Sequence, residues 1–251
     1  MEDAAATAAY RGWPAAARDA VERAIGAHGG WARWRDTEST KLDVQSARGR
    51  LLTLKGYPRT FPAPRQIEIH PHRRTTIFHG YPDARHQGLY VDGDVSIRRV
   101  DDGGVVEGSA AHRATLRGLA KYRRWRPLDA LYFFGYALWH YHVLPFTLGQ
   151  AHFVRMGHGA GGVNVSVDFP ADVHTHSRRQ RFFFDQAGRI CRHDYVADVI
   201  GWWARGAHFW RAYEEQDHLP VALHRQVVVR LFGRPTPLTV LDVKLALPKS
   251  I

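Results

Sequence analysis

The sequence predicts an α+β protein built on one large curved antiparallel sheet, a half-barrel of about ten to twelve strands with helices covering its concave face. Three observations lead to this prediction. Short runs of alternating apolar and polar residues recur from residue 37 onward. Asp92-Gly93 lies between two such runs, as in a tight hairpin. A nearly continuous apolar segment at 128–143 separates two blocks of strands. No Pro/Gly/Ser-rich linker and no repeat divides the 251 residues, so we expect a single domain over 1–251.

The N-terminal half begins with a helix and continues as hairpins. Residues 14–27 have a proline at the start, apolar residues at helical spacing and Gly29-Gly30 after the end. The segment 40–56 predicts a hairpin that turns near 47–49. The segment 64–80 predicts two strands broken at Pro71, and 86–100 predicts a hairpin whose turn is Asp92-Gly93.

A helical insertion over the sheet is expected at about 109–146. It comprises a helix at 109–124 with a basic outer face and a helix at 128–143 that is apolar nearly all round and therefore buried. Strands are expected to resume at 151–156, 163–169, 172–184 and 189–198. A further helix is predicted at 201–216, followed by strands at 221–232 and 238–247.

Composition excludes several classes of protein. Cys191 is the one cysteine, so an internal disulfide and a cysteine-based zinc site are excluded. The net charge of +11 would suit nucleic acid, but the arginines are spread along the chain and no nucleic-acid-binding signature accompanies them, so nucleic acid is an unlikely partner. The N-terminus has no signal-peptide pattern and no apolar run is long enough to span a membrane. We therefore expect a cytoplasmic protein.

The segment His174–Val199 mixes strand pattern with polar side chains. We expect its turn at Asp185–Gly188, which would pair Phe184 with Arg189 and Gln180 with His193. Because side chains alternate between faces, one face would carry ten residues: His174, His176, Arg178, Gln180, Phe182, Phe184, Cys191, His193, Tyr195 and Ala197. Phenylalanines beside histidines are typical of a pocket wall, and the opposite face is expected to be solvated. A shift of one residue in the register would exchange the two faces.

The apolar helix offers a second group of candidate residues. Tyr132, Tyr136, Trp139, His140 and Val143 share a face by helical spacing, and their polar tips would be buried against the sheet. The alternative for both groups is structural, with hydrogen-bonded histidines in a sheet and a core helix with satisfied hydroxyls.

Histidine is abundant enough that a metal site has to be considered. His174 and His176 would share a strand face and chelate one ion if His193 supplied a third ligand. No zinc motif or cysteine pair supports this, and the Gly-rich stretch 157–162 lacks the context of a nucleotide-binding loop. We therefore expect no metal and no cofactor.

The layout resembles the LolA/LppX-like half-barrels. The features that carry the resemblance are "AIGAHGGWARW" near the start, the strand-rich middle and the "RFFFDQAGRICRHDY" hairpin. The resemblance implies a sheet that holds lipid acyl chains under a helical lid. Members of that family are exported, whereas this chain is expected to be a divergent cytoplasmic member with a more polar pocket.

Two functions of different classes follow from these expectations. In the first, an enzyme acts on a largely apolar small molecule by cofactor-free acid–base chemistry, as a cyclase, isomerase, dehydratase or hydrolase would. The candidate catalytic residues are His193, His176, Tyr195 and His140, and the candidate ligand-binding residues are Arg178, Gln180, Tyr136, Trp139, Phe182 and Phe184.

In the second, the protein is a non-catalytic carrier or sensor of a hydrophobic ligand or lipid, with Arg178 meeting a carboxylate. A third interpretation is a peripheral protein whose basic segment 109–124 binds anionic surfaces.

Overall fold

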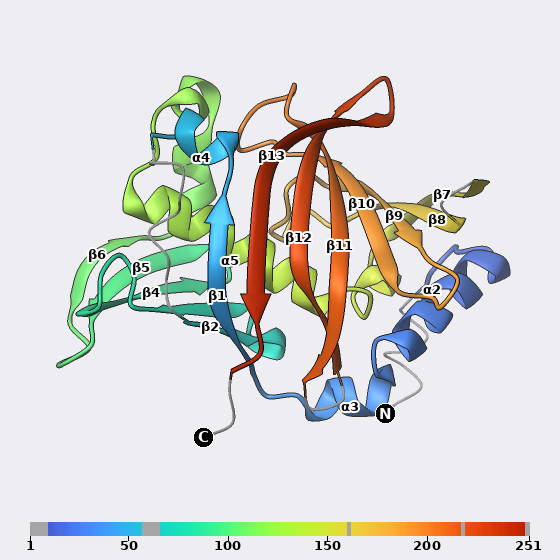
Figure 1. Cartoon of the computed structure of the whole chain (residues 1–251), viewed down its shortest axis with the longest axis horizontal. Coiled ribbons are helices and arrows are strands. Elements are labelled where there is room, and N and C mark those ends of the chain that lie inside the picture. The colour runs from blue at the N-terminus through green and yellow to red at the C-terminus, as the bar shows by residue number, and fades with distance from the viewer. Residues whose placement is uncertain (1–9, 57–65, 160–161, 217–218, 249–251) are drawn as a thin grey trace.

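Thirteen antiparallel strands form one open sheet in the computed structural model, which describes residues 10–56, 66–159, 162–216 and 219–248 (Figure 1). The predicted α+β half-barrel is confirmed. The strands are β1 (Thr40–Arg48), β2 (Gln66–His70), β3 (Thr75–His79), β4 (His86–Val91), β5 (Asp94–Arg99), β6 (Val105–Ser109), β7 (His152–Gly159), β8 (Gly162–Asp168), β9 (Arg179–Phe184), β10 (Ile190–Val196), β11 (Arg205–Gln216), β12 (Leu219–Leu231) and β13 (Arg234–Ala246).

The sheet consists of two meanders joined at their centre. The order is β6-β5-β4-β3-β2-β1-β13-β12-β11-β10-β9-β8-β7, so the first and last strands of the chain pair with each other. Asp43 lies opposite Ala246, and Arg48 lies opposite Asp242. This contact between distant parts of the sequence makes one continuous sheet of both halves.

The helices are α2 (Ala15–Ala27), α3 (Gly30–Asp36), α4 (Arg50–Leu54) and α5 (Pro127–Val143), with 3-10 turns at Pro71–Arg73, His112–Leu116, Gly118–Tyr122 and Leu148–Gln150. In Figure 1, α5 crosses behind β1, β13 and β12. It packs against β2, β3, β4 and β5. Nearly all of its residues are buried, as its uniform apolarity predicted. Within the described residues, no helix is long and apolar enough to cross a membrane. The cytoplasmic location stays a prediction.

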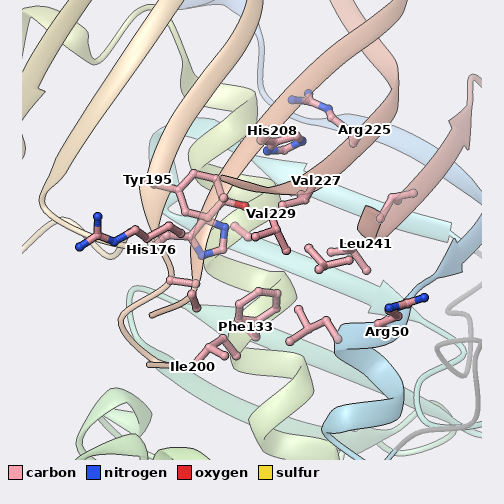
Figure 2. A pocket seen from close by; sticks show the side chains of 18 of the residues that line it. Arg50, Phe133, His176, Tyr195, Ile200, His208, Arg225, Val227, Val229 and Leu241 are labelled. Atoms are coloured by element: carbon pink, nitrogen blue, oxygen red, sulfur yellow. The ribbon is translucent and has the colours of Figure 1, made fainter. Parts of the chain in front are cut away.

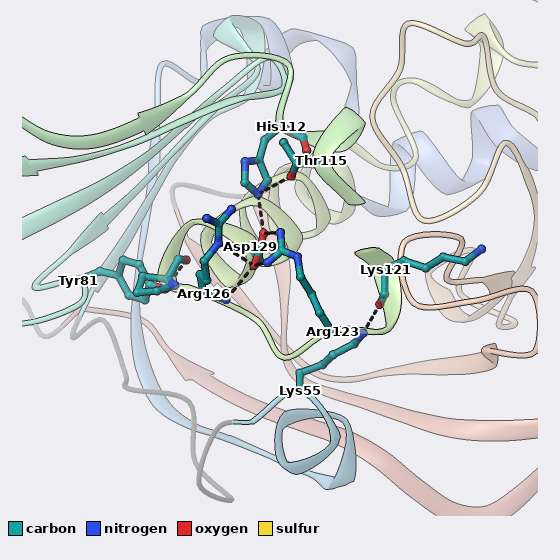
Figure 3. Close-up of polar contacts among 9 residues, drawn as sticks. Lys55, Tyr81, His112, Thr115, Lys121, Arg123, Arg126 and Asp129 are labelled. Carbon is teal, nitrogen blue, oxygen red and sulfur yellow. Dashed lines mark hydrogen bonds and ion pairs between the residues drawn. The ribbon is translucent and has the colours of Figure 1, made fainter. Parts of the chain in front are cut away.

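An ionic cluster fixes the start of α5 (Figure 3). Asp129 is fully buried and accepts hydrogen bonds from both terminal nitrogens of Arg123, at 2.6 and 2.8 Å, and from the backbone N–H of Arg126. His112 Nε2 lies 2.9 Å from the same carboxylate. Burial opposes ionisation of Asp129, but these hydrogen bonds outweigh it and lower the pKa of Asp129 to about 2. Beside this cluster, the buried Lys55 donates to the carbonyl of Lys121 and thereby connects the end of α4 to the same region.

Several predicted elements are confirmed. The helices at 14–27 and 128–143 correspond to α2 and α5. The strand pair broken at Pro71 corresponds to β2 and β3, and Asp92 and Gly93 form the β4–β5 turn with φ of 43° and 101°. The number of strands exceeds the expected maximum by one, because β6 and β11 were not predicted as strands, whereas one predicted strand is the helix α4.

Two predictions of local structure in the first half are wrong. The second strand of the hairpin predicted at 40–56 is instead the short helix α4, because β1 takes β2 and β13 as its two partners. The helix predicted at 109–124 is instead two 3-10 turns, which are separated at Arg117 and Gly118. Arg117 is extended and Gly118 has a φ of +56°, so an α-helix cannot continue there.

The prediction of a helix at 201–216 is also wrong, since most of this segment forms the long strand β11. Its alanines and glutamates favour a helix locally, but it pairs along its length with β12 and over Arg205–Phe209 with β10. Pairing on both sides outweighs the local preference.

Candidate functional site

A cavity of about 600 Å³ lies between α5, the inner face of β10–β13 and α4 (Figure 2). This volume is within the roughly 300–1,000 Å³ typical of small-molecule sites. The residues that line it are Arg50, Leu51, Thr53, Leu54, Phe133, Phe134, Ala137, Leu138, Tyr141, His176, Tyr195, Ala197, Ile200, Trp203, Ala204, Arg205, Gly206, His208, Arg225, Val227, Val229, Val240, Leu241 and Val243.

The regular spacing of two elements builds most of the apolar wall. On β12, Arg225, Val227 and Val229 point inward because alternate residues of a strand share a face. On α5, the residues at 133, 134, 137, 138 and 141 share one side of the helix and close the cavity opposite the sheet.

The mouth of the cavity lies near α4 and the loop between β10 and β11. Leu54 and Trp203 are 59% and 48% exposed and line this end together with the exposed Arg50 and Arg205. At the other end, Tyr141, His208 and Arg225 are buried. The cavity therefore has an open end, where apolar side chains lie beside two arginines, and a closed end with buried polar groups.

One polar group in the closed end is a chain of hydrogen bonds centred on His176. Its Nδ1 lies 2.8 Å from the Tyr136 hydroxyl, and its Nε2 is hydrogen-bonded to the Tyr141 hydroxyl. Tyr195 stacks on the His176 ring with centroids 4.2 Å apart. Burial lowers the pKa of His176 well below its ordinary value and raises the pKa values of Tyr141 and Tyr195. All these rings are therefore neutral near pH 7.

A second polar group consists of His193, His208 and Trp210. Trp210 Nε1 donates to His193 Nδ1 at 3.1 Å, so the proton of the neutral His193 ring is on Nε2. That Nε2 has no hydrogen-bond partner among the described residues, and the same is true of both ring nitrogens of His208. The two imidazole centroids are 4.9 Å apart. Burial, followed by nearby positive charge, lowers the pKa of both rings well below the ordinary value.

Arg225 is the charged side chain of the closed end. It is only 7% exposed, and its Nε donates to the carbonyl of Ala222 at 3.1 Å. The guanidinium lies 3.8 Å from the Trp210 ring centroid and 5.4 Å from that of Tyr141. Burial lowers the pKa of Arg225 to about 10, so it remains a cation at neutral pH.

The structure brings part of the predicted site together. His176 and Tyr195 line the cavity, Tyr136 supports His176 from behind, and His193 lies beside His208. Phe182 stacks on His193 at 5.4 Å, and Phe184 is buried in the core.

Eight of the ten predicted site residues do not line the cavity, and four of these contact other parts of the fold. His140 faces Gln180, with Nε2 3.4 Å from Oε1, and Gln180 donates to the carbonyl of Ser177. Trp139 donates to the carbonyl of Pro71 on the other side of α5. Arg178 is exposed, donates to the carbonyl of Phe169 and lies 3.7 Å from Asp168.

The predicted register of the hairpin needs two corrections. The strand expected from 172 begins only at Arg179, so His174 and His176 lie in the preceding loop. There, two tyrosines of α5 hydrogen-bond them: Tyr132 contacts His174, and Tyr136 contacts His176. A bulge between Ile190 and Arg192 shifts the pairing, so that Phe184 lies opposite Ile190 and Phe182 opposite His193. As a result, Ile190 is fully buried and Cys191 is not, the reverse of the expected faces.

Three residues of the closed end were not predicted from the sequence: Tyr141, His208 and Arg225. His208 was assigned to the wrongly predicted helix, and Tyr141 lies one position beyond the helical face that was chosen. The inward position of Arg225 could have been predicted from the sequence, because apolar residues occupy the alternate positions around it on β12: Val221, Leu223, Val227 and Val229. An arginine within such an apolar series is on the buried face.

No group of three or more His, Cys, Asp or Glu side chains with metal-binding geometry occurs among the described residues. The triad of His174, His176 and His193 considered above is not assembled, because Tyr132 and Tyr136 hydrogen-bond the first two rings.

Comparison with known proteins finds similarity in the arrangement of the elements. A LolA superfamily protein from Nitrosomonas europaea matches with a TM-score of 0.49 and 8% identity, over 93% of this chain and 94% of its own. A DUF1329 family protein from Desulfovibrio piger matches with a TM-score of 0.43 and 11% identity, over 91% of this chain and 90% of its own. No protein-family model and no curated protein matches the chain significantly. These similarities concern the arrangement of the elements alone, and the ligand has to be inferred from the cavity itself.

Proposed function

We propose that the protein binds one largely apolar small molecule in the half-barrel cavity and holds it away from water, as a carrier or sensor. The observation that carries this proposal is the cavity of about 600 Å³, whose walls between the mouth and the closed end are mainly aliphatic and aromatic. Each Å² of apolar surface removed from water contributes about 25 cal/mol, so a ligand that fills this space would bind chiefly through its apolar body.

The hydrogen bonds of the cavity wall support a binding role. His176, Tyr136 and Tyr141 satisfy one another, so these polar groups remain stable beside an apolar ligand. At the mouth, the exposed Leu54 and Trp203 offer apolar surface to an entering molecule beside the exposed Arg50 and Arg205.

Titration with Nile red, a neutral apolar dye, tests the proposal. We expect saturable binding at one site per chain, with a rise in dye fluorescence. Ala137→Trp places an indole in the cavity and should weaken binding at least tenfold, because Ala137 lines the wall on α5. Ala16→Trp adds the same ring at an exposed position of α2 and should leave binding unchanged. Absence of saturable binding, or equal binding by a folded Ala137→Trp variant, would contradict the proposal.

A second candidate function is acid–base catalysis on the bound molecule. The observation that favours it is the His208 ring, which lines the cavity as a neutral imidazole with no partner on either nitrogen among the described residues. The nitrogen lone pair of such a ring can accept a proton from a ligand.

Mass spectrometry separates the two candidates. Molecules that copurify with the native chain and with His208→Asn would be extracted and compared. A carrier retains the same compound in both proteins, whereas an enzyme whose base has been removed accumulates a different one. If both proteins retain the same compound and convert it in vitro at the same rate, His208 is excluded as the base.

A further inference from the structure

Arg225 is a buried cation without a counter-charge. Arg225 is only 7% exposed. Among the described residues, no carboxylate forms an ion pair with its guanidinium. None of the residues that line the cavity is Asp or Glu. Removing a charge from water without a partner is costly, which is why buried charges are usually paired.

The hydrogen-bonding groups around Arg225 contain more donors than acceptors. In the part of the chain that the structure describes, Arg225 Nη1 has no hydrogen-bond partner, although the Nε of Arg225 donates to the carbonyl of Ala222. His193 carries its proton on the unpartnered Nε2, and neutral His208 carries one on either of its two unpartnered nitrogens. The group that would satisfy such a set is one that only accepts hydrogen bonds, and an ionised carboxylate has this property.

The apolar wall continues from this point toward the mouth. From Arg225 through Val227 to Val229, the inner face of β12 extends roughly 13 Å at about 3.3 Å per residue. All three side chains line the same cavity, and Figure 2 shows Arg225 and His208 at one end, with Phe133, Leu241 and Ile200 farther along. A molecule that fills this space has one polar end and an apolar body.

We propose that the ligand is an amphipathic monoanion, a long-chain carboxylate, whose head group binds Arg225 and His208 while its chain lies along Val227 and Val229 toward the mouth. This inference rests on the proposed function, since it presupposes that the cavity is a binding site. The guanidinium presents its donors in a planar fork that matches a carboxylate. One cation balances one negative charge, which favours a carboxylate over a doubly charged phosphate. The carboxylate contact assigned to Arg178 in the carrier hypothesis is therefore transferred to Arg225.

Competition with Nile red on the full chain tests this inference. The competitors are dodecanoate, dodecan-1-ol and dodecyl phosphate, which share one alkyl chain and differ in the head group. In the native protein we expect dodecanoate to bind at least tenfold more tightly than dodecan-1-ol. Arg225→Met removes the guanidinium that lies over Trp210 but keeps a long unbranched side chain, and it should abolish this difference by weakening dodecanoate alone. Arg178→Met, at an exposed position outside the cavity, should preserve it.

The outcomes distinguish failure of the inference from failure of the proposed function. If Nile red binds but the native protein binds dodecanoate and dodecan-1-ol equally, the carboxylate assignment is overturned and the cavity remains a binding site. Tighter binding of dodecyl phosphate than of dodecanoate would also overturn it. If neither dye nor amphiphile binds, the proposed function itself fails. The comparison in the native protein decides the matter even if Arg225→Met does not fold.

Discussion

Lowering the pH from 7.5 to 5.0 should strongly destabilise the protein, because several histidines are buried as neutral rings. Burial lowers the pKa of His140 and of His28 from 6.5 to about 4, against a weaker opposing effect of their hydrogen bonds. Since the folded pKa is depressed, the full stability is present above pH 6.5 and is lost as the pH falls toward 4. At pH 5.0, each of these two rings lowers the free energy of unfolding by about 2 kcal/mol, which gives roughly 4 kcal/mol for both. His176, His193 and His208, whose pKa values are also lowered, add to this loss. A typical domain has only about 5–15 kcal/mol in total.

Urea unfolding at pH 7.5, 6.0 and 5.0, followed by tryptophan fluorescence, measures this loss. His140→Gln removes one titrating ring, so its unfolding free energy should fall by about 2 kcal/mol less over the same pH range. The matched control is His158→Gln at an exposed position of β7, which should retain the full pH dependence. A loss below about 1 kcal/mol in the native protein, or an unchanged pH dependence in His140→Gln, would refute the reasoning.

Two further predictions concern stability and use matched variants. Gly135→Ala should lower the melting temperature, because the added Cβ would lie 2.4 Å from Tyr90 Cβ. Overpacking costs about 1–3 kcal/mol, which outweighs a helix-propensity gain of about 1 kcal/mol. At Gly26 in α2, an added Cβ meets no atom within 4 Å, so Gly26→Ala should raise the free energy of unfolding by about 0.5–1 kcal/mol. A less stable Gly26→Ala variant, or a more stable Gly135→Ala variant, would contradict the packing argument. Asp129→Asn should cost about 2–3 kcal/mol in urea unfolding, because Arg123 loses its buried partner. Asp102→Asn, in an exposed pair, should change little, and equal effects of the two substitutions would show that burial is not decisive.

Local patterns in the sequence were sufficient for most of the fold. The Asp92-Gly93 turn, the strands on either side of Pro71 and the buried helix α5 all depend on neighbouring residues, and all three were predicted correctly. The errors occur where distant pairing competes with local preference. The segment at 205–216 is a strand because β10 and β12 are its neighbours, and α4 replaces a strand because β13 pairs with β1.

The candidate site was predicted only in part, because it too depends on contacts between distant parts of the chain. The sequence was sufficient to predict that His193 and Tyr195 lie among aromatic residues, because the alternation along one hairpin and the apolarity of one helix are local properties. His176 was predicted on the same strand face, but it lies in the loop before β9. Only the tertiary structure decided which polar groups meet. The bulge near Cys191 sets the hairpin register, and the curvature of the sheet brings β11 and β12 opposite α5. Arg225 and His208 thereby reach the closed end of the cavity, while Arg178 remains in solvent. Such a meeting depends on contacts between residues far apart in the chain, and these are determined by the packing of the whole sheet.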